Sequence, residues 1–131
     1  LKELFSVFGR IEWNESKPDD VVNGVQSDSR KVQSGFVFVA VRGITSDGHD
    51  HIDMAIQNGA QALVVECAEQ IPETFKGAVL EVLDSKIILA ELLKIFYERP
   101  EERLISIGIT GTNGKTSTSY MIECILNEAS I

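Results

Sequence analysis

The chain has 131 residues and a mass of 14.4 kDa, which is enough for one domain with a buried core. Its net charge of -8 and pI near 4.7 argue against a nucleic-acid partner, which needs a basic surface. A phosphate ligand is still compatible with this charge, because backbone N–H groups can hold one. No apolar run approaches the ~18 residues of a membrane span, and no charged-then-apolar leader stands at the start, so no membrane partner is expected.

Two cysteines, Cys67 and Cys124, fall in predicted strand and helix contexts without metal-ligand spacing. We expect both to be reduced residues in or near the core of a cytosolic protein, with a disulfide between them as the alternative. The sequence begins with Leu1, so we expect its natural start to lie upstream.

Short apolar strands and helices alternate along the first part of the chain. Helical spacing of apolar residues predicts a helix over residues 1–9, followed by a strand over 21–26. Residues 36–41 are apolar and rich in β-branched and aromatic types, which is typical of a strand buried on both faces. The loop 42–50 follows, and residues 51–59 predict a helix. That helix is expected to have Asp50 as its N-cap and Gly59 just past its end.

Two further buried strands are predicted over residues 62–66 and 78–82. The strongest helix pattern covers residues 84–98, with Asp84 as its cap. Its mostly apolar stripe is expected to comprise Ile87, Ile88, Glu91, Leu92, Ile95 and Phe96. A boundary is predicted at Arg99, because the residue before a proline disfavours helix.

A last strand over residues 104–109 is predicted to lead through a glycine loop into a helix from about Lys115. Alternating strands and helices indicate an α/β fold with a mainly parallel sheet. We expect residues 1–100 to form a small α/β domain and residues 101–131 to be the first β-loop-α unit of another. A lone unit of that kind cannot bury its strand on both faces, so either it packs on the first domain or the rest of its sheet is missing.

The glycine loop has the pattern G-x-x-G-x-x-G-K-T, which begins at Gly108. A strict phosphate loop, G-x-x-x-x-G-K-[ST], would need glycine at position 109, where the chain has isoleucine. Glycines still let the backbone approach phosphate oxygens, and N–H groups at a helix N-terminus favour anions. Lys115 would reach the β- and γ-phosphates, and the Thr116 hydroxyl would bind Mg²⁺. The alternative is a glycine-rich turn with a solvated lysine.

The segment GITGTNGKTS resembles the ATP loop of the Mur ligases, the ATP-dependent amide-bond-forming enzymes of peptidoglycan synthesis. Related folylpolyglutamate synthases share similar loops, so this motif indicates the superfamily and not the substrate. The resemblance implies ATP and Mg²⁺ as cofactors, Lys115 as a catalytic residue and Thr116 as the Mg²⁺ ligand. The residues that it implies for ATP binding are Gly111, Thr112, Asn113, Gly114, Lys115, Thr116 and Ser117.

A second segment, residues 27–52, resembles the N-terminal UDP-binding domain of the two later Mur ligases. That domain carries D-[ST]-R, then P/S-G-x-x-F-V-A, then a segment like G-x-x-x-D-G-x-x-[FY]-I. The matching residues are Asp28-Ser29-Arg30, Ser34-Gly35, Phe38-Val39-Ala40, Gly43 and Asp47-Gly48. Ligands of open α/β sheets dock at loops after the carboxyl ends of strands, and short hydroxyl side chains hydrogen-bond a uracil or a pyrophosphate. The contacts that the resemblance implies with UDP-N-acetylmuramoyl (UDP-MurNAc) are Ser27, Ser29, Ile44, Thr45 and Ser46.

Other polar residues near this segment allow simpler interpretations. Asp28 and Arg30 either pair and fix the turn, or Arg30 reaches the diphosphate. His49 and His51 have no carboxylate partner at a telling spacing, so we expect solvated or capping roles. The acidic residues of segment 66–73 are expected to lie in a solvated loop.

Two ligases of the family share this N-terminal style. One adds the third residue of the stem peptide to UDP-MurNAc-L-Ala-D-Glu, and the other adds D-Ala-D-Ala. Thr112 and Asn113 favour the first, whereas the added amino acid, diaminopimelate or lysine, stays open. The resemblance implies the N-terminal part of a cytoplasmic bacterial ligase that binds the UDP moiety and is inactive alone. A stand-alone non-catalytic nucleotide-binding module and a remnant that binds neither ligand are the other hypotheses.

Overall fold

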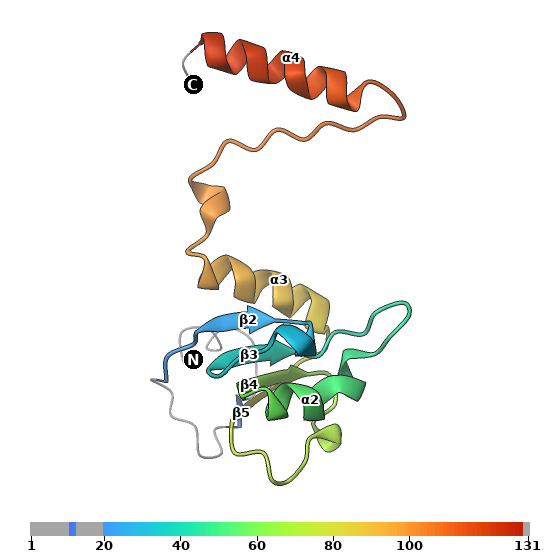
Figure 1. Ribbon diagram of the computed structural model, residues 1–131, viewed down its shortest axis with the longest axis vertical. Coiled ribbons are helices and arrows are strands. Elements are labelled where there is room, and N and C mark those ends of the chain that lie inside the picture. The colour runs from blue at the N-terminus through green and yellow to red at the C-terminus, as the bar shows by residue number, and fades with distance from the viewer. Residues whose placement is uncertain (1–10, 13–19, 130–131) are drawn as a thin grey trace. The chain divides into compact units, whose positions relative to one another are not determined.

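The computed structural model describes residues 11–12 and 20–129 (Figure 1). The chain divides into two compact units, Leu1–Pro100 and Glu101–Ile131. The helix predicted over residues 1–9 lies outside the described residues.

The first unit contains a mainly parallel sheet, so the predicted α/β class is confirmed. Its strand order is β1-β5-β4-β3-β2, and β1 pairs antiparallel with β5 while the other neighbours are parallel. The strands are β1 (Ile11–Glu12), β2 (Gly24–Gln26), β3 (Phe36–Val39), β4 (Ala60–Val65) and β5 (Ala78–Glu81). All four strands predicted between residues 21 and 82 are therefore present, with ends that differ by up to three residues.

The described residues contain three α-helices, two in the first unit and one in the second. They are α2 (Ile52–Gln57), α3 (Ser85–Phe96) and α4 (Lys115–Glu128). Short 3₁₀ turns occupy several connections: η1 (Ser29–Lys31), η2 (Gly48–His51), η3 (Ala68–Gln70) and η4 (Pro100–Glu102).

The sheet is buried on both faces, as the apolar run of β3 predicts. Val37 and Val39 belong to one core cluster, which includes Leu92 of α3. Phe38 and Ala40 point to the other cluster, which includes Ile52 and Ala55 of α2. Successive side chains of a strand alternate between faces, so a strand needs apolar residues at every position when helices cover both sides.

Helix α3 starts where predicted, because the Asp84 carboxylate accepts hydrogen bonds from the backbone N–H groups of Lys86 and Ile87. The stripe predicted for this helix is partly wrong. Ile87 is 61% exposed, and the packed face is instead made by Leu92 with Ile88, Leu89, Leu93 and Phe96. The face of α3 that packs on the sheet is therefore shifted by about one residue from the predicted stripe.

The start of α2 differs from the prediction. Asp50 is not its cap; His51 occupies that position and makes no side-chain cap bond. The capping carboxylate belongs to Asp47, which accepts from the His49 N–H at the start of η2. The 3₁₀ turn therefore begins before the predicted helix and feeds into it. Gly59 follows the end of α2, as predicted.

A turn of left-handed backbone ends α3 before Pro100, in agreement with the predicted boundary. Glu98 and Arg99 have φ values of 57° and 50°. The Arg99 N–H donates to the Lys94 carbonyl oxygen at 2.7 Å, which closes the helix end.

In the second unit the strand predicted over residues 104–109 is absent, and that prediction was wrong. Residues 105–111 have no regular secondary structure, and Leu104, Ile105 and Ile107 are 66%, 88% and 53% exposed. A strand needs a neighbour for its backbone hydrogen bonds, and no described strand pairs with this segment. Helix α4 begins at Lys115, as predicted.

Both cysteines are free, but the expectation that both lie in or near the core is only partly right. Cys67 is half-buried beside η3, whereas Cys124 is exposed on α4. Helix α4 has no buried residue, so a helical position there does not imply burial.

The face of α3 that meets the sheet can be tested by paired truncations. Leu92→Ala should lower the free energy of unfolding by about 2–5 kcal/mol, because Leu92 is fully buried. Ile87→Ala, five residues earlier on the exposed side of α3, should change it by only about 0.5 kcal/mol. Urea titration followed by circular dichroism measures both, and equal losses would contradict the observed packing.

Candidate functional site

A pocket of about 430 Å³ lies at the carboxyl ends of β2 and β3, the edge where ligands dock on parallel sheets. The loop after β2, the loop after β3 and helix α2 contribute to it. Its lining residues are Ser27, Asp28, Ser29, Arg30, Val41, Ser46, Gly48, His51 and Met54. Hydroxyl, charged and apolar side chains thus surround one space.

Three of the five side chains predicted to contact a uridine nucleotide, Ser27, Ser29 and Ser46, line this pocket. The other two, Ile44 and Thr45, are exposed on the loop after β3 and are not among the lining residues.

Ser29 is buried, and its hydroxyl donates to the Met54 Sδ atom at 3.3 Å. A thioether is a weak acceptor, so a carbonyl or phosphate oxygen in the pocket would be a stronger partner for this hydroxyl. The Ser29 backbone is held by the Asn58 side-chain amide, which donates to its carbonyl oxygen at 2.9 Å. The backbone of Ser29 is therefore held in place, while its hydroxyl can exchange the weak Met54 acceptor for a ligand oxygen.

Asp28 and Arg30 pair with each other, which was one of the two interpretations of this motif. The Arg30 Nε and Nη2 atoms donate to the two Asp28 oxygens, each at 2.9 Å. The Arg30 side chain, and to a lesser extent its backbone N–H, holds the pKa of the Asp28 carboxyl down at about 2. Both residues line the pocket, and their charges largely cancel there.

The loop that carries Ser46 is closed by backbone hydrogen bonds. The Gly43 N–H donates to the Ser46 carbonyl oxygen, and the Gly48 N–H donates to the Val41 carbonyl oxygen, each at 2.9 Å. A Cβ at position 48 would lie 2.5 Å from the Val41 nitrogen, so only glycine allows this close approach. The loop therefore returns to the sheet edge and brings Ser46 to the pocket.

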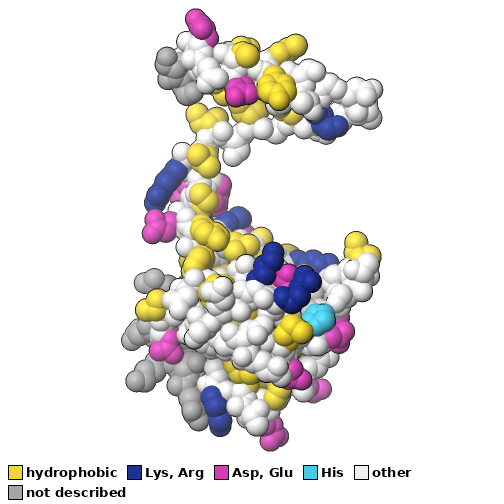
Figure 2. Space-filling view, viewed as in Figure 1, with side chains coloured by type: hydrophobic (Ala, Val, Ile, Leu, Met, Phe, Trp, Pro, Cys, Tyr) yellow, Lys and Arg dark blue, Asp and Glu magenta, His cyan; other side chains and the backbone are white. Residues whose placement is uncertain are grey.

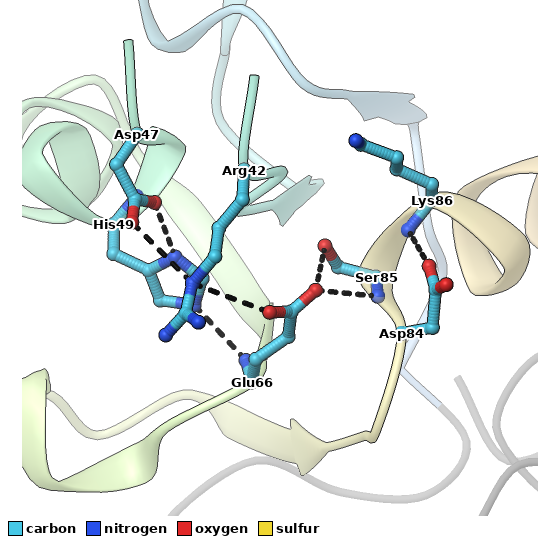
Figure 3. A network of polar contacts seen from close by, with 7 residues as sticks. All are labelled: Arg42, Asp47, His49, Glu66, Asp84, Ser85 and Lys86. Carbon is cyan, nitrogen blue, oxygen red and sulfur yellow. Dashed lines mark hydrogen bonds and ion pairs between the residues drawn. The ribbon is translucent and has the colours of Figure 1, made fainter. Parts of the chain in front are cut away.

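A polar network fixes the base of the same loop (Figure 3). The His49 Nδ1 atom lies 2.6 Å from an Asp47 carboxylate oxygen, and its Nε2 atom lies 3.0 Å from the Glu66 backbone nitrogen. His49 is buried, so the solvated or capping role expected for it was wrong. Its carboxylate partner lies only two residues upstream, in the turn that starts η2.

The two partners of His49 indicate which ring nitrogen donates a hydrogen bond. A backbone N–H can only donate, so Nε2 must be the unprotonated acceptor. The ring proton then resides on Nδ1 and is donated to Asp47. This arrangement of partners fits the Nδ1–H tautomer of the ring.

Glu66 links the network to α3, and the expected solvated loop was wrong for this residue. Its side chain is only 16% exposed and accepts hydrogen bonds from the Ser85 backbone N–H at 3.0 Å and hydroxyl at 2.8 Å. Arg42 Nε lies 3.3 Å from Glu66 and 3.4 Å from Asp47.

These contacts lower the pKa values of both carboxyls. The Ser85 N–H is the largest cause for Glu66, and the His49 N–H is the largest for Asp47. Hydrogen bonds of this kind favour the charged carboxylate.

In the second unit, the glycine loop leads into α4 through Gly114, whose φ of 76° is left-handed. Helix α4 has no side-chain cap, so its first N–H groups are open to an anion. The Lys115 ammonium donates a hydrogen bond to the Gly111 carbonyl oxygen at 2.7 Å, so its side chain folds back onto the loop. A Cβ placed at Gly108 or Gly114 would meet no atom within 4 Å, so the loop has room beside its backbone. These features fit a nucleotide phosphate.

Over the described part of the chain, no group of three or more His, Cys, Asp and Glu side chains is arranged to hold a metal ion. Mg²⁺ commonly takes few protein ligands and shares phosphate oxygens, so Thr116 in the first turn of α4 remains compatible with this role. Among the described helices, none is long and apolar enough to cross a membrane.

The fold and the site together define an α/β domain with a pocket at its strand ends, followed in the sequence by a glycine loop that leads into a helix. Residues 21–108 match the family model described as Mur ligase family, catalytic domain. The chain belongs to the Mur ligase family.

Several curated relatives bear the name UDP-N-acetylmuramoyl-L-alanyl-D-glutamate--2,6-diaminopimelate ligase. The chain is 45% identical to the protein from Chlorobaculum tepidum over 85% of its own length and 22% of that protein. It is 40% identical to the protein from Geobacter sulfurreducens over 84% of its length and 21% of that protein. The match to the Fusobacterium nucleatum protein is 36% and covers 96% of the chain and 26% of the relative. The chain thus spans about a quarter of the length of these relatives.

Solved structures of the family are also similar. A UDP-N-acetylmuramoylalanyl-D-glutamyl-2,6-diaminopimelate--D-alanyl-D-alanyl ligase from Acinetobacter baumannii superimposes with a TM-score of 0.69 and 27% identity, over 97% of this chain and 27% of that one. The MurF ligase from Thermotoga maritima in complex with ADP gives a TM-score of 0.59 and 31% identity, over 84% of this chain and 24% of that one.

The network predicts a specific acid sensitivity. The pKa of Glu66 is lowered in the folded chain, so its stabilisation is present above the ordinary carboxyl pKa of 4.5 and is lost as the pH falls through the lowered value. Glu66→Gln should therefore reduce the free energy of unfolding more at about pH 7 than at about pH 3. Urea titrations at the two pH values measure this difference.

The exposed Glu69 in the neighbouring turn η3 provides a matched control. Glu69→Gln should alter stability little at either pH. An equal loss for Glu66→Gln at both pH values would show that the charge of Glu66 is not what its partners stabilise.

Proposed function

We propose that this chain is the nucleotide-binding N-terminal part of a Mur ligase that adds the third amino acid to UDP-MurNAc-L-Ala-D-Glu. The observation that carries the proposal is the pocket at the sheet edge, where Ser27, Ser29 and Ser46 converge. The 36–45% identity to relatives named for that reaction supports this choice over the D-Ala-D-Ala-adding ligase.

The pocket suits the UDP handle of such a substrate. Val41 and Met54 supply apolar surface for a base or ribose, and the serine hydroxyls can pair with the polar edge of uracil or with the diphosphate. Ile44 and Thr45 would reach the ligand from the loop after β3 if that loop closes over it.

The second unit would supply part of an ATP site. The N–H groups of the loop and of the first turn of α4 would hold the phosphates, Lys115 would neutralise charge on the γ-phosphate, and Thr116 would bind Mg²⁺. Bound ATP supplies the phosphoryl group that activates a carboxylate for amide formation. The Lys115 ammonium would have to leave the Gly111 carbonyl oxygen to do this.

The chain spans only about a quarter of the length of its relatives, and this bears on whether the chain alone can catalyse a reaction. The described residues contain the pocket at the sheet edge and the glycine loop, so we propose that they bind substrate and nucleotide without turnover by themselves. In a cytoplasmic bacterial ligase the remaining length would supply the amino-acid site. The names of the relatives favour diaminopimelate over lysine as the added amino acid.

Nucleotide binding at the pocket can be tested by calorimetry. UDP-MurNAc-L-Ala-D-Glu should bind the chain, and Ser29→Ala should weaken binding about five- to tenfold, as expected for loss of one or two hydrogen bonds. Ser34→Ala is the matched control, since Ser34 is exposed and lies before β3, at the opposite end of the strand from the pocket. Absence of binding to the unaltered chain would contradict the proposal.

The phosphate loop can be tested separately. Lys115→Ala should weaken Mg-ATP binding about tenfold or more, because a charge-assisted bond to phosphate is lost. Neither protein should form an amide from UDP-MurNAc-L-Ala-D-Glu, ATP and diaminopimelate. Product above the Lys115→Ala background would show that residues 1–131 are catalytically competent.

A further inference from the structure

His51 lies in the pocket, yet neither the family resemblance nor the UDP contacts proposed above give it a role. It is exposed at the end of η2 and is one of the residues that line the pocket. Its Nε2 atom lies 3.1 Å from the hydroxyl oxygen of Ser46, the loop residue that also lines the pocket.

The charge of the pocket bears on what the His51 side chain can bind. Asp28 and Arg30 are charged lining residues, and they are paired through two hydrogen bonds. A diphosphate diester carries two negative charges, which a neutral pocket does not balance. Histidine is the side-chain type that can carry a positive charge near neutral pH, and His51 is the histidine that lines this pocket.

Other charged groups on the surrounding elements are accounted for as follows. Asp47 is occupied by His49 and Arg42. Lys31 of η1, Asp50 of η2 and Asp53 of α2 are exposed and are not lining residues. Figure 2 shows a histidine side chain exposed on the same face as a group of Lys and Arg side chains with an acidic side chain among them.

We propose that His51 is a ligand-binding residue that, when protonated, donates a hydrogen bond to a phosphate oxygen of the uridine diphosphate group. The inference rests on the proposed function, because it names an added contact at that site. The Ser46 hydroxyl, within hydrogen-bonding distance of the imidazole, would hold the ring at the pocket wall. Binding of the diphosphate then strengthens as the pH falls, whereas binding of uncharged uridine does not.

The test uses ligands whose own charge is constant. UDP-N-acetylglucosamine has a diphosphate diester and lacks the terminal phosphate that titrates near pH 6 in UDP. Calorimetry should give a dissociation constant about two- to fivefold lower near pH 6 than near pH 8, the size expected of one partly exposed charge-assisted bond. Uridine should bind equally at both pH values.

Three variants separate the causes. His51→Phe, which keeps an aromatic ring but removes both ring nitrogens, and His51→Gln, which keeps a neutral hydrogen-bonding group, should both abolish the pH dependence. Ser29→Ala should weaken binding equally at both pH values, and this locates the ligand in the pocket. Circular dichroism checks that each variant is folded.

Each result decides the matter. A pH dependence that persists in His51→Phe and His51→Gln, or one that uridine shows equally, overturns the role of His51. Binding without any pH dependence also overturns it and leaves the proposed function standing. If neither uridine nor UDP-N-acetylglucosamine binds at either pH, the proposed function fails together with this inference.

Discussion

A parallel strand has to be paired along its edges and covered on its faces, and this constraint explains most of the structure. In the first unit, β3 and β4 have neighbours on both sides, and apolar clusters cover both faces of the sheet. Because these strands run in one direction, the loops that follow β2 and β3 emerge at the same edge, where Ser29 and Ser46 meet. The pocket thus results from the parallel pairing of the strands, which brings both loops to one edge of the sheet.

The same constraint explains the second unit. Residues 104–109 have the composition of a buried strand, but no described strand pairs with them and Ile105 is almost fully exposed. Apolar composition alone therefore does not make a strand, because a strand also needs a neighbour for its backbone hydrogen bonds. Helix α4 formed where predicted because its hydrogen bonds lie within its own segment.

Local patterns in the sequence were sufficient for much of the fold. The strands from β2 to β5, the cap at Asp84 and the start of α4 all follow from neighbouring residues. The stripe on α3 was misplaced, because the partners that select among its apolar faces lie elsewhere in the chain.

The candidate site shows the same division. The serines that line the pocket were found through a motif, whereas the contact between Glu66 and Ser85 joins residues far apart in sequence and left no local signal. For His49 a signal did exist. An aspartate two residues before a histidine, in a turn, is a spacing at which the two side chains can meet.

The hydrogen bond between the Glu66 N–H and the His49 ring lies at the end of the hydrogen-bond ladder between β3 and β4. In the ladder between β3 and β4, the Ala40 N–H donates to the Val64 carbonyl oxygen. One step along, the Glu66 N–H donates to an imidazole nitrogen. The side chain of His49 thus substitutes for a main-chain carbonyl and ends the ladder without an unpaired donor. The chain has left the sheet after Val39 of β3 by this point, and the pocket lies beyond the ends of β2 and β3.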